Sequence, residues 1–250
     1  MSSIGTGYDL DASSFSPDGR VFQVEYAAKA VQASVTVIAL SSKKGVVVAV
    51  DQPIHSKLDV EGANSRIMRI NNKIGFVGSG LFPDVFAICN WAREEDNKNY
   101  KEINQHISVK KLAERVAQYV HVYTLATDRP FGASVFITSW DQKEGSSIYC
   151  IETSGQCYKY FGWVIGRMST KTRPHSQNLP NLLKIFTFFK KKLPCQQNQK
   201  SKKFKGLGED CKLTKQELIK RAIHILLTTR DEGSTGHRIE MGWIGEDSNN

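Results

Sequence analysis

The order in which helical and strand patterns follow one another is the feature that most limits how this chain can fold. Residues 35–40 and 45–50 are apolar, largely β-branched runs separated by a short turn, so they predict a hairpin of buried strands. Further strand patterns cover 67–70, 73–78, 133–140, 147–151, 157–160 and 239–244, and helical patterns cover 20–33, 81–97, 108–124 and 214–229. Strands and helices do not alternate, which disfavours a doubly wound nucleotide fold and predicts layered α+β, with helices covering packed sheets.

Length and composition restrict the class of protein further. The 250 residues fit one large domain better than two, and 40% hydrophobic with 24% charged residues is typical of a globular chain. The longest apolar runs, 35–40 and 46–50, fall far short of the roughly 18 residues that a membrane helix needs. The first 30 residues hold four acidic side chains and no apolar block, which argues against a secretory signal. Five scattered cysteines suit a reducing compartment and suggest no disulfide framework.

The basic charge of the chain is concentrated in one segment. Of 34 basic and 25 acidic residues, 13 and 2 lie within 167–215, which leaves 21 basic and 23 acidic residues elsewhere. One interpretation is a basic binding module that acts on nucleic acid or acidic partners through residues 169–212. The other is a solvated surface insertion. The aromatic residues at 186, 188 and 189 cluster instead of alternating with the charges, which disfavours a base-stacking platform and a nucleic-acid partner.

Motifs for cofactor and metal chemistry are missing from the sequence. No Gly-Lys-Ser/Thr phosphate loop occurs, and Gly78-Ser79-Gly80 lacks the third glycine of a dinucleotide loop. The six histidines show no HExxH spacing, and the cysteines form no CxxC pair. Thr6 would need processing to become an N-terminal nucleophile, and no predicted strand begins there to hold it. We therefore expect neither a cofactor nor a metal ion.

One N-terminal stretch is specific enough to indicate a family. The sequence GYDL at 7–10, followed after five residues by SPDGRVFQVEYA at 16–27, resembles the N-terminal motif of proteasome core-particle α-type subunits. Shorter matches follow at 56–58, 119–125, 129–132 and 239–245. The resemblance covers about 1–166 and 213–246 and fails across about 169–212. It implies a mobile gate tail at 1–16 and a single domain at 17–246 with an atypical basic insertion at 169–212.

The resemblance also implies a fold and the loss of a catalytic activity. The fold is a four-layer αββα sandwich of the N-terminal-nucleophile hydrolase type, placed in the seven-membered outer ring of a barrel-shaped protease. In the catalytic β-type relatives a threonine opens the first strand and a lysine activates it, and the matching positions here are Val35 and Ile67. Asp51 keeps an acidic position, but a carboxylate alone cannot hydrolyse a peptide. We therefore expect a structural and regulatory subunit with no catalytic residue.

Gate residues are implied at four positions. In the family, the residues matching Tyr8, Asp9, Pro17 and Tyr26 form contacts that hold the tail in an open arrangement, whereas closed tails plug the axial pore. Pro17 suits a pivot because its φ angle is fixed. Tyr8 offers a hydroxyl and a ring, and Asp9 offers an acceptor. Local turn packing is the alternative role for each of these residues.

An activator-docking pocket is implied at Gly19, Glu25, Arg66 and Leu81, between neighbouring α subunits. A basic residue there would pair with the terminal carboxylate of an activator. Arg66 stands where many α subunits have lysine, which keeps the charge but changes the geometry. Ser34 stands where the family has glycine.

The partners that the resemblance implies are other α-type and β-type proteasome subunits, regulatory activator particles, and unfolded protein substrates in transit. The implied process is ubiquitin-dependent protein degradation in the cytoplasm and nucleus, and no membrane partner is expected.

Overall fold

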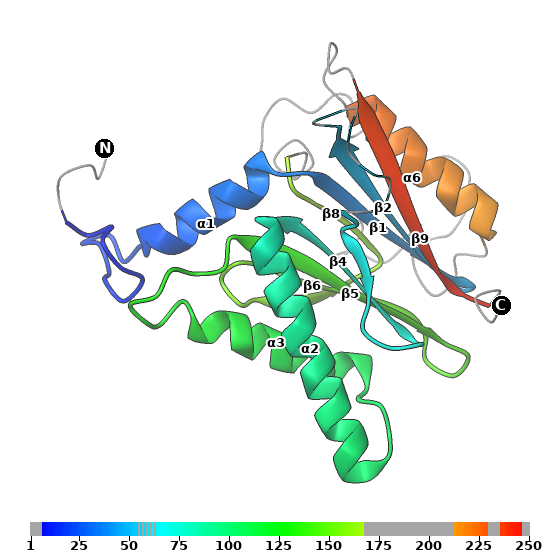
Figure 1. The fold of residues 1–250 in the computed structure, drawn as a ribbon, viewed down its shortest axis with the longest axis horizontal. Coiled ribbons are helices and arrows are strands. Elements are labelled where there is room, and N and C mark those ends of the chain that lie inside the picture. Colours follow the sequence, from blue (N-terminus) through cyan, green and yellow to red (C-terminus); the bar gives the residue numbers. More distant parts are fainter. Residues whose placement is uncertain are drawn as a thin grey trace, which may run out of the picture.

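The computed structural model describes residues 7–54, 64–167, 213–229 and 236–246, together with residues 56, 58, 60 and 62. The predicted insertion at 169–212 and the first six residues of the predicted tail lie outside the described residues. Figure 1 shows the described elements as two stacked sheets with helices on their outer sides.

Two antiparallel sheets form the centre of the fold. The first has the order β8-β1-β2-β9 and the second has the order β3-β4-β5-β6-β7. The first sheet contains β1 (Thr36–Ser42), β2 (Gly45–Pro53), β8 (Gly162–Ile165) and β9 (His237–Gly245). The second contains β3 (Ile67–Arg69), β4 (Ile74–Gly80), β5 (Ala133–Asp141), β6 (Gly145–Ile151) and β7 (Cys157–Tyr160). The predicted first hairpin is confirmed, with Val37 opposite Val50.

Helices cover both outer faces of the sheet pair. These are α2 (Phe82–Ile103) and α3 (Val109–Val122) on the second sheet and α6 (Lys215–Thr229) on the first. One apolar core lies between α2, α3 and the second sheet, one between the two sheets, and one between α6 and the first sheet. The αββα sandwich is therefore confirmed. Because β1 lies between two of these cores, all seven of its residues are buried, which explains its nearly continuous apolar run.

Local sequence signals set several helix ends. The Ser108 hydroxyl accepts a hydrogen bond from the Lys111 amide at 3.5 Å, as its predicted capping role requires. Thr214 and Glu217 form a reciprocal capping box at the start of α6, with the Thr214 amide 3.0 Å from the Glu217 carboxylate. No helix in the described parts of the chain is long and apolar enough to cross a membrane.

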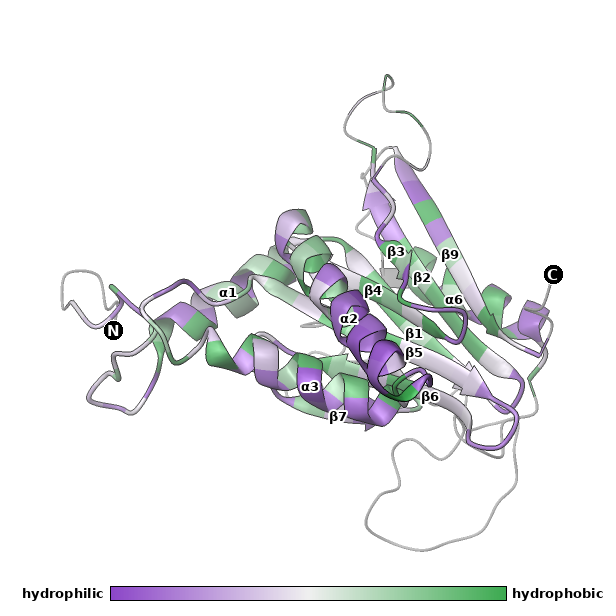
Figure 2. Cartoon of the chain, turned by 60° about the horizontal axis from the view of Figure 1, so that its bottom comes forward, coloured by the Kyte–Doolittle hydropathy of each residue, from purple (hydrophilic) through white to green (hydrophobic). Residues whose placement is uncertain are grey.

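The fold differs from the predicted elements in two places. Strand β8 was not predicted, because a single residue, Phe161, separates it from β7 while the chain crosses from one sheet to the other. Helix α2 extends to Ile103 instead of residue 97, and Asn104 ends it in the left-handed conformation with φ of 54°. Figure 2 shows α2 as largely hydrophilic on the side seen there, so its last turns lack the apolar spacing that predicts a helix.

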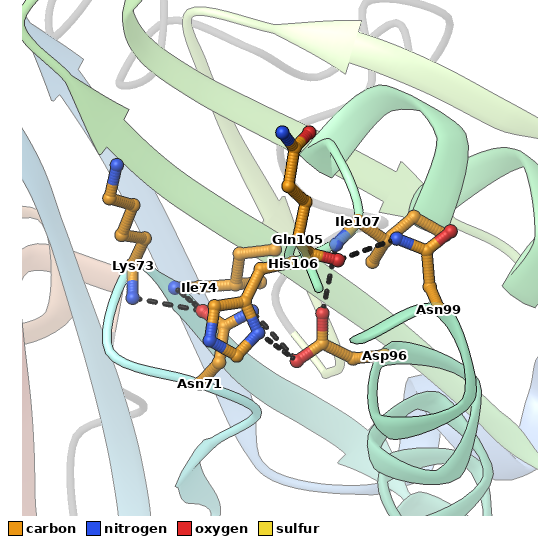
Figure 3. A network of polar contacts seen from close by, with 8 residues as sticks. All are labelled: Asn71, Lys73, Ile74, Asp96, Asn99, Gln105, His106 and Ile107. Atoms are coloured by element: carbon orange, nitrogen blue, oxygen red, sulfur yellow. Dashed lines mark hydrogen bonds and ion pairs between the residues drawn. The ribbon is translucent and has the colours of Figure 1, made fainter. Parts of the chain in front are cut away.

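A buried carboxylate organises the far end of α2 (Figure 3). Asp96 accepts hydrogen bonds from the Asn71 amide at 3.0 Å and from the Ile107 backbone N–H at 3.0 Å. Nδ1 of His106 lies 2.9 Å from the same carboxylate. The Asp96 side chain is only 2% exposed. This network therefore joins the β3–β4 turn, helix α2 and the loop that leads into α3.

A second buried carboxylate holds the start of α2. Asp84 accepts two hydrogen bonds of 2.7 Å from the Arg129 guanidinium and one of 2.8 Å from the Gly132 N–H. Burial alone would raise the pKa of the Asp84 carboxyl, but these hydrogen bonds outweigh burial and hold its pKa below the ordinary value. The segment before β5 is thereby tied to the first turn of α2.

We expect Asp96→Ala to lower the free energy of unfolding by about 3 kcal/mol, because it leaves the buried Ile107 N–H and the partly buried Asn71 amide without this acceptor. Denaturant unfolding of the purified chain measures this. Glu102→Ala, at an exposed position of the same helix, is the control and should change stability by less than about 0.5 kcal/mol. Equal stabilities of the two variants would contradict the role assigned to Asp96.

Candidate functional site

Residues 16–20 form a closed, hydrogen-bonded turn before helix α1 (Phe22–Ala33). The Gly19 N–H donates to the Ser16 carbonyl at 2.8 Å, and the Ser16 N–H donates to the Arg20 carbonyl at 2.9 Å. Gly19 has φ of 73°, a conformation that favours glycine. Pro17 is exposed at the second position of this turn, where its fixed φ is compatible with the geometry.

An ion pair fastens this turn to the first turns of α1. The Arg20 Nε donates to the Glu25 carboxylate at 2.7 Å, and Nη2 of Arg20 donates to the second carboxylate oxygen. The hydrogen bonds from Arg20 hold the pKa of the Glu25 carboxyl below its ordinary value. Glu25 therefore presents a negative charge that is already paired within its own chain.

The tail contacts α1 through Asp9. The Gln23 side-chain amide donates to the Asp9 carbonyl, and the Tyr26 hydroxyl lies 3.4 Å from the Asp9 carboxylate, which is long for a hydrogen bond. Tyr8 is 40% exposed, and its side chain forms no hydrogen bond or ring contact with any other described residue. Of the four predicted gate residues, the structure brings the side chains of Asp9 and Tyr26 together, and Pro17 lies in the turn at 16–20 with its side chain exposed.

Sequence reasoning missed Gln23. It lies inside the matched motif, three residues before Tyr26 and on the same side of α1, so helical spacing was the signal that could have identified it.

At the other end of α1, three segments meet at the carbonyl of Gly80. Nη1 of Arg66 donates to this oxygen at 2.9 Å, and the Ser34 hydroxyl donates to it at 2.9 Å. The Arg66 guanidinium lies 5.5 Å from the centre of the Phe82 ring, and the next residue after Gly80, Leu81, is half-exposed. The Arg66 guanidinium therefore lies against the two residues that flank Leu81 in the chain, Gly80 and Phe82.

The guanidinium of Arg66 is only partly satisfied. Burial lowers the pKa of Arg66 below its ordinary value, and the nearby Glu240 carboxylate partly offsets this effect. Its Nε is buried and has no hydrogen-bond partner among the described residues. A half-buried cation with an unused donor gains from an additional anionic partner.

The four predicted pocket residues do not form one cluster within this chain. Gly19 and Glu25 lie at the start of α1, whereas Arg66 and Leu81 lie beside its end at Ser34. The 12-residue helix spans about 18 Å at 1.5 Å per residue, which separates the two pairs. Within this chain the four predicted residues therefore form two separate pairs, and not one pocket.

The positions that match catalytic residues are apolar. Val35 lies between Ser34, which caps α1, and the start of β1, and both Val35 and Ile67 pack against the core between the two sheets. The Ser79 hydroxyl donates to the Val35 carbonyl at 2.6 Å. Asp51 lies 3.2 Å from the His237 ring. A helix precedes Val35, so this position has neither a nucleophilic side chain nor a free α-amine.

No group of histidine, cysteine and acidic side chains in the described ranges is arranged to hold a metal ion.

The geometry defines a class of protein: a sandwich of the N-terminal-nucleophile hydrolase type in which an internal valine, Val35, directly precedes the first strand. The comparison with models of known protein families supports this class. The family model described as "Proteasome subunit" matches residues 31–177, and a second model, the N-terminal signature of A-type proteasome subunits, matches residues 8–30. The chain belongs to the proteasome subunit family, and the N-terminal signature places it among the α-type subunits.

Individual relatives show which α-type subunits the chain is similar to. The chain is 46% identical over 180 residues to "Proteasome subunit alpha type-3" of Drosophila melanogaster, covering 72% of this chain and 71% of that protein. It is 46% identical over 185 residues to the protein of the same name from Oryza sativa subsp. japonica, with 73% and 74% covered. For Dictyostelium discoideum the identity is 36% over 253 residues, with 100% and 90% covered.

The relatives decide between the two functions that the sequence left open. They support a non-catalytic α-ring role, and the first ten residues also resemble the type-3 α subunit. They give no support to the alternative of a basic binding module acting through residues 169–212.

We expect Gln23→Ala to speed amide hydrogen exchange of the backbone at residues 9–15 by roughly twofold to tenfold. The physical reason is the loss of a hydrogen bond with a net contribution of about 0.5–1.5 kcal/mol. Exchange followed by mass spectrometry of the full-length chain measures this. Gln32→Ala, near the other end of α1, is the matched control and should leave these amides unchanged. Exchange that is the same in both variants would remove Gln23 from the tail contacts.

Proposed function

We propose that this α-ring subunit contributes to the gate at the substrate entrance of the proteasome and to a docking site for activator C-termini. Its partners would be other α-type and β-type subunits, activator particles, and unfolded proteins in transit. The process would be ubiquitin-dependent degradation in the cytoplasm and nucleus. The proposal rests on the contacts at the two ends of α1. The first turns of the helix contact the tail, and Ser34 after its last turn shares the Gly80 carbonyl with Arg66, whose guanidinium is only partly hydrogen-bonded.

The gating part of the proposal rests on how the tail is held. Gln23 and Tyr26 contact the backbone and the side chain of Asp9, so a movement of α1 is transmitted to the tail. Only Ala27 and Val31 of α1 are fully buried, and Figure 1 shows the helix extending away from the two sheets. Few contacts with the body therefore oppose a small displacement of its first turns.

The docking part of the proposal rests on the attraction between the positive charge of Arg66 and a C-terminal carboxylate. An incoming C-terminal carboxylate would meet the Arg66 guanidinium, with Leu81 and Phe82 available to its last apolar side chains. A neighbouring subunit would present residues equivalent to Gly19 and Glu25. Because Arg20 already pairs with Glu25 in this chain, an equivalent pair would repel the carboxylate less than a lone glutamate would.

The absence of a nucleophile gives the first test. We expect the purified chain to show no peptidase activity and to co-assemble with other α-type chains, as native mass spectrometry of the complex can establish. Val35→Thr should stay inactive, because α1 precedes residue 35 and no free α-amine arises there. Hydrolysis by the isolated chain that is abolished by changing one serine or threonine would overturn the non-catalytic role.

Docking has its own test in the assembled core particle. A photoreactive peptide with a free C-terminal carboxylate and a preceding apolar residue should crosslink to this subunit near Leu81. We expect Arg66→Ala to raise the half-saturating peptide concentration about tenfold or more, because a charge-assisted hydrogen bond contributes about 1.5–3 kcal/mol.

One control is the same peptide with an amidated C-terminus, which should crosslink weakly to both the wild type and Arg66→Ala. The other control is the variant Arg66→Lys, which keeps the positive charge at this position. Crosslinking that does not depend on the terminal carboxylate would refute docking at Arg66.

A further inference from the structure

The carbonyl of Gly80 is shared by two donors that come from distant parts of the chain. Ser34 ends α1, Arg66 precedes β3, and both place a donor 2.9 Å from this oxygen. Gly80 is buried and has φ of 119°, and a Cβ atom there would lie 2.1 Å from the Gly132 carbonyl oxygen. The residue at position 80 is therefore restricted to glycine, and its carbonyl faces Ser34 and Arg66.

Either of the two hydrogen bonds can satisfy the Gly80 carbonyl oxygen when the other is lost. A carbonyl oxygen has two lone pairs, so both donors can be accommodated together. If Arg66 moves towards an external carboxylate, the Ser34 hydroxyl still satisfies the buried oxygen. Without that hydroxyl, the departure of Arg66 would leave a buried acceptor with no partner from these two residues, which is unfavourable.

The position of Ser34 does not depend on Arg66. The Ser34 N–H donates to the Val31 carbonyl at 3.0 Å, which caps α1, and the Ser34 carbonyl accepts from the Arg167 N–H at 3.2 Å. These two backbone hydrogen bonds attach Ser34 to α1 and to the end of β8. The hydroxyl therefore stays near Gly80 when the Arg66 side chain moves.

We propose that Ser34 is a positioning residue that allows Arg66 to exchange the Gly80 carbonyl for the C-terminal carboxylate of a bound peptide. The inference rests on the proposed docking function. In this arrangement Ser34 retains the Gly80 carbonyl while Arg66 turns outward, so α1 remains attached to the start of α2 during docking. In the unliganded chain Arg66 is hydrogen-bonded to the Gly80 carbonyl, and this bond must break before the guanidinium can bind a carboxylate. The Ser34 hydroxyl lowers the free-energy cost of breaking it, because the carbonyl keeps one donor.

The test is the crosslinking titration of the assembled core particle with the photoreactive free-carboxylate peptide. We expect Ser34→Ala to raise the half-saturating concentration roughly tenfold. Ser34→Thr and Ser34→Val form a matched pair that differs only in the hydroxyl, and the extended backbone at residue 34 accepts both. The threonine variant should bind like the wild type, and the valine variant should bind like Ser34→Ala.

A double-mutant cycle separates positioning from a general structural effect. In an Arg66→Ala background, Ser34→Ala should cause no further weakening, because no guanidinium remains to be exchanged. Native mass spectrometry of each particle confirms that the variant subunit is incorporated. If Ser34→Ala is not incorporated, the threonine and valine variants supply the comparison.

Each outcome has a distinct meaning. A wild type that does not distinguish the free carboxylate from the amide would refute the proposed docking function itself. A wild type that does distinguish them, with equal or tighter binding by Ser34→Val than by Ser34→Thr, would overturn the role of Ser34 alone. Equal weakening by Ser34→Ala with and without Arg66 would also overturn it, because the serine would then act on structure and not through Arg66.

Discussion

The apolar contact between the two sheets is the constraint on which the rest of the structure depends. Strands β1 and β2 pack against the second sheet on one face and against α6 on the other. This double burial favours apolar residues at the central positions of both strands, and Val35 and Ile67 pack against the core between the two sheets. The interior that holds the layers together thus occupies the place where catalytic relatives of this fold carry their nucleophile and its activating lysine.

Helix α1 lies outside that core and carries the features that suit a ring subunit. Its first half contacts the tail and the turn at 16–20, and its end reaches the Gly80 carbonyl through Ser34. A 12-residue helix, about 18 Å long, carries these features towards its opposite ends, so a single chain does not bring them into one pocket. The separation favours sites that are completed between neighbours, as a closed ring with one repeated interface would provide.

Most elements could be predicted from local patterns, and the exceptions have physical reasons. The apolar, β-branched runs at 35–40 and 45–50 correctly indicate the central hairpin, and Ser108 and Thr214 correctly indicate helix starts. The last turns of α2 escaped prediction because they are stabilised by the polar network of Asp96, and not by an apolar stripe. Gln23 was missed because its partner is a backbone carbonyl of the tail, and its helical spacing from Tyr26 was the one signal that the sequence offered.

By itself the sequence determined the layered α+β architecture, the α-type motif and the absence of a nucleophile at Val35, since each depends on residue types and their spacing along the chain. Only the tertiary structure decided that residues 34 and 66 share the carbonyl of Gly80, and that the four residues predicted to form a docking pocket lie in two separate pairs. Such contacts join segments that lie tens of residues apart, and packing of the sheets and helices sets their geometry. A linear pattern records which groups are available, whereas the folded chain decides which donor meets which acceptor.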